Sequence, residues 1–220
     1  MTSRYRILTY ISALAISLAV IAEPTDSRFL KEAEALYGKQ GSDTVRRWKD
    51  MLDNAGKTGT NEKLLMVNDF FNQNVAFRSD QEIWGKSDYW ATPLQTMGIQ
   101  QGDCEDFSIA KYVSLLKLGI PDEQLRLVYV KADIGLSKPQ AHMVVAYYTT
   151  PTSEPFILDN LSTEIRPASQ RSDLVPVFSF NSNGLWIGND SKAKANKPET
   201  RLSRWRDVLL RMRAEGLDTL

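Results

Sequence analysis

The spacing of hydrophobic residues changes along the chain, from a helical period in the first third to short strand-like runs in the last. Between residues 23 and 75, apolar positions recur every three or four residues, as they do in amphipathic helices. Polar capping residues and two glycines divide this part into three predicted helices, at 26–38, 42–56 and 60–75. The N-terminal part is therefore expected to be helical.

A further helix is predicted from about Asp103 to Leu118, with Gly119 as its stop signal and Pro121 just beyond. Its apolar residues are Ile109, Tyr112, Val113, Leu115 and Leu116. So many large apolar side chains among these sixteen positions are typical of a buried helix rather than a surface one.

Beyond this helix the chain becomes rich in β-branched and aromatic residues. Strands are predicted in 124–132, 141–150 and 155–161, and a hairpin in 175–188 turns at Asn183–Gly184. An amphipathic, arginine-rich helix at about 199–214 closes the chain. Helices followed by strands indicate an α+β fold.

A long aromatic connection, residues 76–102, joins the N-terminal helices to the buried helix. It contains Trp84, Tyr89 and Trp90 and one predicted short helix, Thr92–Met97. A connection of this length is usually functional or packed against the core. The three aromatic side chains therefore have two interpretations, a cleft or docking surface and ordinary core packing.

Composition limits the classes of function. The 220 residues are 42% hydrophobic, which is enough for one full core, and a single globular domain is expected after residue 22. Lys plus Arg equals Asp plus Glu at 27 each, so no nucleic-acid partner is indicated.

The first 22 residues have the pattern of a secretory signal peptide. Arg4 and Arg6 precede an apolar run, and Val20 and Ala22 provide a small-residue cleavage site. An uncleaved membrane anchor is the alternative, but the run is short and interrupted by polar residues. We therefore expect an exported protein, soluble after cleavage, with a net charge of −2.

The chain contains a single cysteine and a single histidine, and both lie at positions suited to catalysis. Cys104 stands at the start of the buried helix, His142 near the start of a strand, and Asp159 at the end of the next strand. If these strands pair as a hairpin, His142 and Asp159 meet at one edge of the sheet. Cys104 would then be a nucleophile, His142 its base and Asp159 the residue that orients the imidazole.

Each of these residues also has an ordinary structural interpretation. A lone cysteine is often a core residue, a lone histidine is often structural, and Asp159 suits a turn. Asp88 or Asp133 could take its place as the orienting acid. An exported protein with one cysteine forms no internal disulfide, and one Cys with one His makes a poor metal site.

Three carboxylates surround Cys104, namely Asp103, Glu105 and Asp106. Their charge opposes thiolate formation. Helix capping accounts for Asp103 and Asp106, whereas a bound Ca²⁺ accounts for all three and offsets their charge. Three carboxylates fall short of the roughly six to eight oxygens that Ca²⁺ takes, so backbone carbonyls and water would complete such a site.

The stretches "GDCEDFSIAKY", "AHMVVAYY" and "FILDNL", with "WGKSDYWATPLQ" and "SRWRDVLLRM", resemble the bacterial transglutaminase-like cysteine proteinases, specifically the LapG-type periplasmic proteases. The resemblance covers about residues 25–213, without a match for 167–174. It implies a papain-like, transglutaminase-like fold with a catalytic core at about 80–190. It also implies catalysis by Cys104, His142 and Asp159, and Ca²⁺ bound by Asp103, Glu105 and Asp106.

The same resemblance implies a biological role. Such a periplasmic protease cleaves a large secreted adhesin near its N-terminus, at an Ala-Ala-containing site, and so promotes biofilm dispersal. An inner-membrane receptor for cyclic di-GMP is its inhibitory partner. Two alternatives remain open from the residues themselves. One is a transglutaminase that uses the same triad, and the other is a non-catalytic periplasmic interaction module with a buried Cys104.

Overall fold

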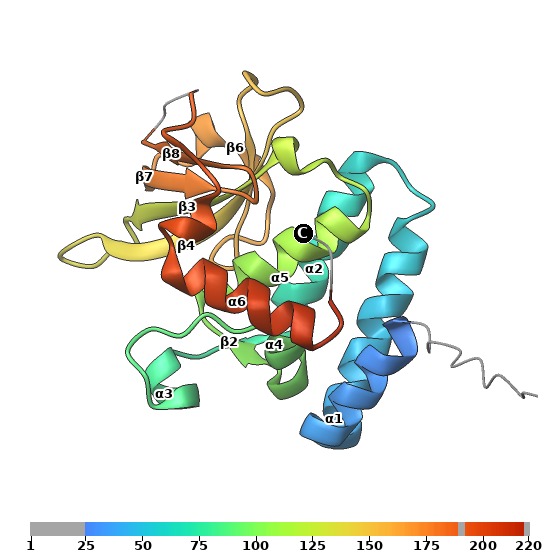
Figure 1. Ribbon diagram of the computed structural model, residues 1–220. Coiled ribbons are helices and arrows are strands. Elements are labelled where there is room, and N and C mark those ends of the chain that lie inside the picture. The colour runs from blue at the N-terminus through green and yellow to red at the C-terminus, as the bar shows by residue number, and fades with distance from the viewer. Residues whose placement is uncertain (1–24, 189–191, 218–220) are drawn as a thin grey trace, which may run out of the picture.

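A computed structural model of the chain describes residues 25–188 and 192–217 (Figure 1). The predicted signal peptide lies outside these residues. Helices gather on one side of an antiparallel sheet, which confirms the predicted α+β class (Figure 1). The helices are α1 (Thr25–Ala55), α2 (Thr60–Asn74), α3 (Asp80–Trp84), α4 (Pro93–Ile99), α5 (Cys104–Lys117) and α6 (Ser203–Ala214).

The predicted break at Gly38 is a kink within α1. Gly38 has φ 65° and ψ −165°, a conformation that glycine adopts without the steric penalty of a Cβ. The second predicted helix begins earlier than expected, because residues 39–41 are helical as well. Thr92 caps α4 as the sequence suggests, whereas α3 and the short β1–β2 pair were not predicted.

The main sheet has the strand order β6-β5-β4-β3-β7-β8-β9, and its neighbouring strands are antiparallel. Its strands are β3 (Leu125–Ala132), β4 (Gln140–Tyr147), β5 (Phe156–Leu158), β6 (Arg166–Pro167), β7 (Leu174–Phe180), β8 (Gly184–Ile187) and β9 (Ala195–Asn196). A separate parallel pair joins β1 (Ala76–Phe77) to β2 (Gln101–Gly102). The predicted hairpin of β4 and β5 is present, with Val145 opposite Leu158.

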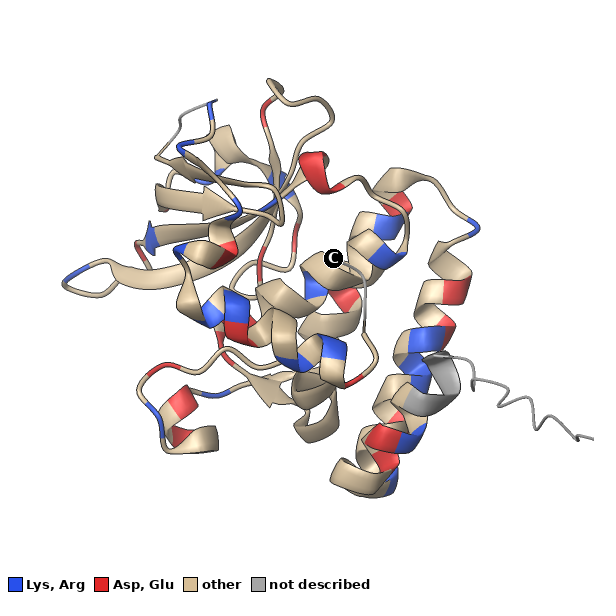
Figure 2. Cartoon of the chain, in the orientation of Figure 1, with Lys and Arg blue, Asp and Glu red and all other residues tan. Residues whose placement is uncertain are grey.

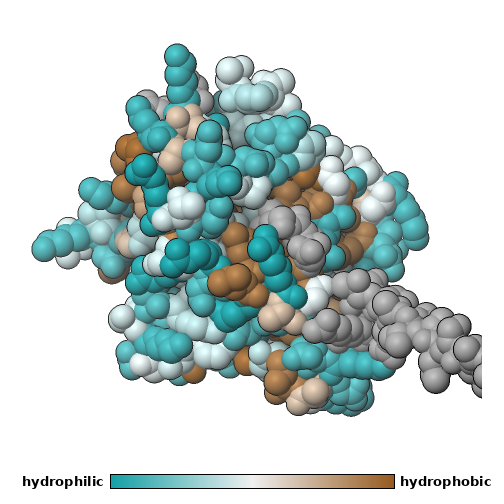
Figure 3. Space-filling view, in the orientation of Figure 1, coloured by the Kyte–Doolittle hydropathy of each residue, from teal (hydrophilic) through white to brown (hydrophobic). Residues whose placement is uncertain are grey.

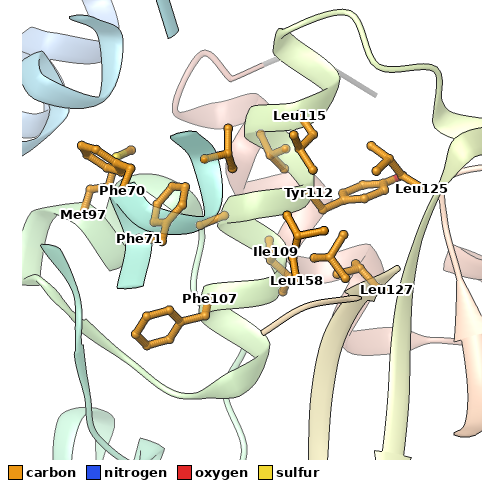
Figure 4. Packing of buried hydrophobic residues seen from close by; sticks show 14 of the residues in the cluster. Phe70, Phe71, Met97, Phe107, Ile109, Tyr112, Leu115, Leu125, Leu127 and Leu158 are labelled. Carbon is orange, nitrogen blue, oxygen red and sulfur yellow. The ribbon is translucent and has the colours of Figure 1, made fainter. Parts of the chain in front are cut away.

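Helix α5 lies at the centre of the molecule. Every residue from Cys104 to Leu115 is buried, as its composition predicted. Figure 4 shows Phe71 of α2 on one side of this helix and Leu125 and Leu127 of β3 on the other. Because α5 is enclosed by other elements, its first turn is held in a fixed place against the sheet.

Charged and apolar residues are both distributed over the described part of the molecule. Acidic and basic residues both occur along α1 (Figure 2), and apolar residues form separate patches on the face seen in Figure 3. Within residues 25–188 and 192–217, no helix is long and apolar enough to cross a bilayer.

Helix α6 attaches to the rest of the protein through Trp205, which is fully buried. Its ring lies 6.0 Å from that of Tyr112 on α5 and 5.4 Å from that of Phe180 on β7, in edge-on geometry. This helix therefore covers the junction between α5 and the sheet.

We expect Trp205→Ala to lower the free energy of unfolding by about 3–5 kcal/mol, because it removes a large side chain from a closed core. Urea unfolding followed by circular dichroism measures this change. Leu210→Ala is the matched control, because Leu210 lies on the same helix with 58% of its surface exposed, and a change of about 0.5 kcal/mol or less is expected there. Equal effects of the two substitutions would contradict the proposed attachment of α6.

Candidate active site

The first turn of α5 is fixed by a reciprocal capping arrangement. Asp103 is the N-cap residue, and its Oδ1 accepts a hydrogen bond from the Glu105 amide at 3.3 Å. Asp106 reaches back, and its Oδ2 accepts from the Asp103 amide at 3.2 Å. Cys104 is therefore the first residue of the helix, where the backbone N–H groups and the helix dipole favour negative charge.

The Cys104 thiol is buried, and its immediate partner is a carboxylate. Its Sγ donates a hydrogen bond to Glu105 Oε2 at 2.7 Å, and 9% of the residue is exposed. Burial and the charge of Glu105 raise the pKa of this thiol well above its usual value, with a smaller contribution from Asp103. A hydrogen bond from the Met143 amide lowers the pKa in part. In this arrangement the sulfur is a protonated thiol.

Contacts between α5 and β4 bring the cysteine to the strand that carries the histidine. Ser108 Oγ donates to the Met143 carbonyl at 2.9 Å, while the Met143 amide serves the Cys104 sulfur. Met143 directly follows His142 in β4, so the nucleophile and base candidates come from neighbouring backbone segments.

His142 and Asp159 form a buried pair. His142 Nε2 lies 2.8 Å from Asp159 Oδ1, and the two residues are 4% and 2% exposed. Asp159 directly follows β5, as the hairpin prediction required. Because Nε2 faces the carboxylate, Nδ1 is the ring nitrogen that does not contact Asp159. The other acids considered lie elsewhere: Asp88 pairs with Arg204, and Asp133 accepts from the Gly135 amide.

The carboxylate of Asp159 is held on both of its oxygens. Arg171 Nη2 lies 2.7 Å from Oδ2, and the Leu161 amide donates to Oδ1 at 3.0 Å. Burial opposes ionisation, but the hydrogen bond and charge of His142, with help from Leu161 and Arg171, lower the pKa of Asp159 to about 2. Asp159 is thus ionised at any ordinary pH.

Two further side chains hold the backbone at Asp159, and sequence reasoning did not find them. Lys111 Nζ and Asn72 Nδ2 each donate to the Asp159 carbonyl at 2.9 Å. Burial lowers the pKa of Lys111 to about 7. A lysine inside an otherwise apolar helix was the available signal for Lys111, whereas Arg171 lies in the stretch that the family resemblance did not match.

The acidic residues around Cys104 form two overlapping groups. Ligand atoms of Asp103, Cys104 and Glu105 lie within 4.8 Å of one another, and so do those of Asp80, Asp103 and Asp106. The structure thus places Asp103 beside each of the other two predicted ligands. It also adds Asp80 from α3, which the sequence did not indicate.

In the second group, the pKa values of Asp103 and Asp106 are raised by burial and by the neighbouring carboxylates. Burial raises the pKa of Asp103 to about 10, and the charges of Glu105, Asp106 and Asp80 add to this effect. Burial also raises the pKa of Asp106 to about 8, despite hydrogen bonds from the amides of Ala91 and Asp103. Asp80 Oδ1 is buried without a hydrogen-bond partner. Converging carboxylates with an orphaned oxygen fit a hard divalent cation, which prefers oxygen ligands.

Gly102 allows this close packing. A Cβ at this position would lie 2.8 Å from the Cβ of Asp106 and 2.9 Å from its Oδ2. Since atoms this close overlap, a larger residue at position 102 would push the Asp106 carboxylate away from the start of α5.

One residue of the aromatic connection, Trp90, is part of the hydrophobic core. Trp90 is 7% exposed and stacks on Phe180 with ring centroids 5.9 Å apart. Trp84 and Tyr89 pack on each other outside the main core, with centroids 4.8 Å apart. The core-packing interpretation therefore describes Trp90.

We expect the stability contributed by Asp159 to disappear in acid. A carboxyl whose pKa is lowered by folding stabilises the protein above its unfolded pKa of 3.8, and this contribution is lost as the pH falls toward 2. The difference in unfolding free energy between wild type and Asp159→Asn should shrink by about 2 kcal/mol between pH 5 and pH 2. Chemical denaturation in the presence of EGTA measures it. Asp207→Asn on the surface of α6 is the control, and an equal pH-dependent change there would contradict a special role for Asp159.

Comparison with known proteins agrees with this geometry. The family model for bacterial transglutaminase-like cysteine proteinases (BTLCP) matches residues 39–187. Three solved structures of Legionella pneumophila LapG are 38% identical to the chain and cover 85% of it. The alignments include 97% of two of these structures and 98% of the calcium-bound one, with TM-scores of 0.71, 0.74 for the EGTA-treated form and 0.73 for the calcium-bound form. No curated protein sequence matches. The structure has a cysteine at the start of a buried helix and a buried His–Asp pair on the adjoining hairpin, as a cysteine proteinase requires. Together with the family match and the 38% identity to LapG, this shows that the chain belongs to the bacterial transglutaminase-like cysteine proteinase family.

Proposed function

We propose that the protein is a calcium-dependent cysteine endopeptidase with Cys104 as nucleophile, His142 as general base and Asp159 as orienting acid. The observation that carries this proposal is the buried His142–Asp159 pair, 2.8 Å apart, with His142 on the strand against which the Cys104 helix packs. The family membership supports peptidase chemistry, and the calcium-bound LapG structure supports a role for the ion.

The reaction begins with transfer of the thiol proton to His142 Nδ1. Asp159, ionised and fixed by Arg171, stabilises the imidazolium that results. The sulfur attacks the carbonyl carbon of the scissile amide, and the N–H of Cys104 at the helix start donates to the developing oxyanion. His142 then protonates the leaving amine, and water hydrolyses the thioester with His142 again as base.

The acidic residues around Cys104 affect this mechanism because they change the pKa of the thiol. Asp103, Glu105 and Asp106 would hold the calcium ion, and Asp80 is a fourth candidate on α3. When bound, the ion supplies positive charge that offsets these carboxylates. With its charge offset, Glu105 would stabilise the protonated thiol less, and the helix dipole at Cys104 would favour the thiolate. The same residues that oppose ionisation in the metal-free protein would thereby permit it.

The substrate and partners are proposed from the resemblance. The substrate is a large surface adhesin, cut near its N-terminus at an Ala-Ala-containing site, so that the adhesin is released and the biofilm disperses. The inhibitory partner is an inner-membrane receptor that responds to cyclic di-GMP. Both fit a periplasmic protein that loses residues 1–22 on export.

Cleavage of the N-terminal segment of the organism's largest secreted adhesin tests the catalytic assignment. With calcium, protein from residue 23 should cut the segment, whereas Cys104→Ala and His142→Ala should lose at least about a thousandfold in kcat/KM, as the loss of a triad member predicts. Gel analysis of the products measures the rates, and Leu210→Ala on the surface of α6 should keep full activity.

Three other outcomes of this assay would each change the assignment. Products that form only when a primary amine is added would indicate a transglutaminase. Cleavage that persists in Cys104→Ala would exclude Cys104 as nucleophile. No cleavage, with slow alkylation of Cys104 in calcium, would indicate a non-catalytic interaction module.

Calcium binding is tested by isothermal titration in the Cys104→Ala background, which keeps the carboxylates. We expect Asp103→Asn and Glu105→Gln each to weaken calcium affinity roughly tenfold or more, because each removes a charged oxygen ligand. Asp53→Asn on α1 is the control and should bind calcium as the parent does. If the parent takes up no calcium and EGTA leaves cleavage by the wild type unchanged, Asp103 and Asp106 act as helix caps only, and the calcium proposal is wrong.

A further inference from the structure

The face of the sheet turned away from α5 carries a second, smaller apolar cluster. Val128 and Val130 of β3, Val144 and Ala146 of β4 and Ile157 of β5 are buried there, separate from the main core. They form the floor of a pocket with a volume of about 320 Å³. This volume falls within the range of small-molecule sites, and none of Cys104, His142 and Asp159 lines the pocket.

The pocket has two arginines in its lining and, among the described residues, no carboxylate. Arg171 is neutralised, because it pairs with Asp159 at 2.7 Å and with Asp173 at 2.8 Å. Arg126 is different. It is 8% exposed, and within residues 25–188 and 192–217 no Asp or Glu forms an ion pair with it.

Arg126 is held in place by two aromatic rings and a hydrogen bond to the Tyr148 side chain, and not by any carboxylate of the described residues. Its guanidinium lies 3.9 Å from the ring centroid of Trp186 and 4.7 Å from that of Tyr148, and its Nε is buried with no hydrogen-bond partner. A buried guanidinium with unused donor capacity favours a bound carboxylate, which its geometry matches.

The apolar floor extends away from this charge in one direction. Arg126, Val128 and Val130 alternate along β3 and therefore share one face of the strand. The distance from the first to the last of them is roughly 13 Å at about 3.3 Å per residue. Among the described residues, Arg126 is the one lining cation without an ionic partner, and its place at one end of an apolar trough is complementary to a linear molecule with one anionic end.

We propose that this pocket binds a medium-chain aliphatic carboxylate, with its head group on Arg126 and its alkyl chain along Val128, Val130 and Val144. The charge of the lining excludes a cationic ligand, and the absence of a second free cation among the described lining residues favours a monoanion over a dianion. This binding site contains none of the three candidate catalytic residues.

Titration calorimetry with decanoate in EGTA tests the proposal on the intact mature chain. Decanoate should bind, decanol should bind at least about tenfold more weakly because it lacks the charge, and octanoate should bind roughly tenfold more weakly because it lacks two methylenes. Methyl NMR shifts confined to Val128, Val130, Val144 and Ile157 should locate the ligand.

Two variants separate the head group from the tail. Arg126→Gln should remove the preference for decanoate over decanol, whereas Arg166→Gln, at an exposed arginine outside this pocket, should leave it unchanged. Ala146→Leu fills the trough and should abolish binding, and it decides the question if Arg126→Gln fails to fold. Equal affinity for decanoate and decanol, no binding of decanoate, or binding only of a peptide with a C-terminal aliphatic residue would overturn the proposal.

Discussion

The structure depends above all on the negative charge gathered at the buried start of α5. Asp103 and Asp106 cap the helix, Glu105 accepts from the Cys104 thiol, and Asp80 adds a carboxylate from α3. Burial and mutual repulsion raise the pKa of Asp103 to about 10. Such a cluster is stable only with protons or a cation, since unpaired buried charges carry a large desolvation penalty. The same charge sets the state of the sulfur.

On the other side of the site, a carboxylate is surrounded by hydrogen-bond donors instead of by other acids. Asp159 is surrounded by donors: His142 and Arg171 on its carboxylate, and Lys111 and Asn72 on its carbonyl. These donors come from β4, a loop, α5 and α2, so the acid joins the helical side of the molecule to the sheet. A carboxylate restrained in this way keeps the imidazole in one orientation, which general-base catalysis requires.

The two sides meet at Met143. Its carbonyl accepts from Ser108 on α5, and its amide serves the Cys104 sulfur. The backbone of β4 at Met143 thus connects the side chains of Ser108 and Cys104 on α5 to the strand that carries His142. The pocket lined by Arg126 lies on the other face of this sheet, where strand alternation directs Val144 and Ala146 away from α5.

The sequence by itself determined what is local. Hydrophobic period and capping residues predicted the order of the longer helices and strands, the break at Gly38, a helix start at about Asp103 and the β4–β5 hairpin. The hairpin in turn placed His142 and Asp159 at one edge of the sheet, because antiparallel pairing fixes which residues are neighbours.

Only the tertiary structure brought Asp80, Lys111, Asn72 and Arg171 to the site. Each comes from a different segment. Arg171, Lys111 and Asn72 hydrogen-bond to Asp159, although they lie 12, 48 and 87 residues away from it in the sequence. Period and capping describe neighbours within one element, whereas these contacts arise from how α2, α3, α5 and the loop after β6 pack around it. That no carboxylate of the described residues pairs with Arg126 is likewise a result of packing, since a sequence shows an arginine but not which carboxylates lie within its reach.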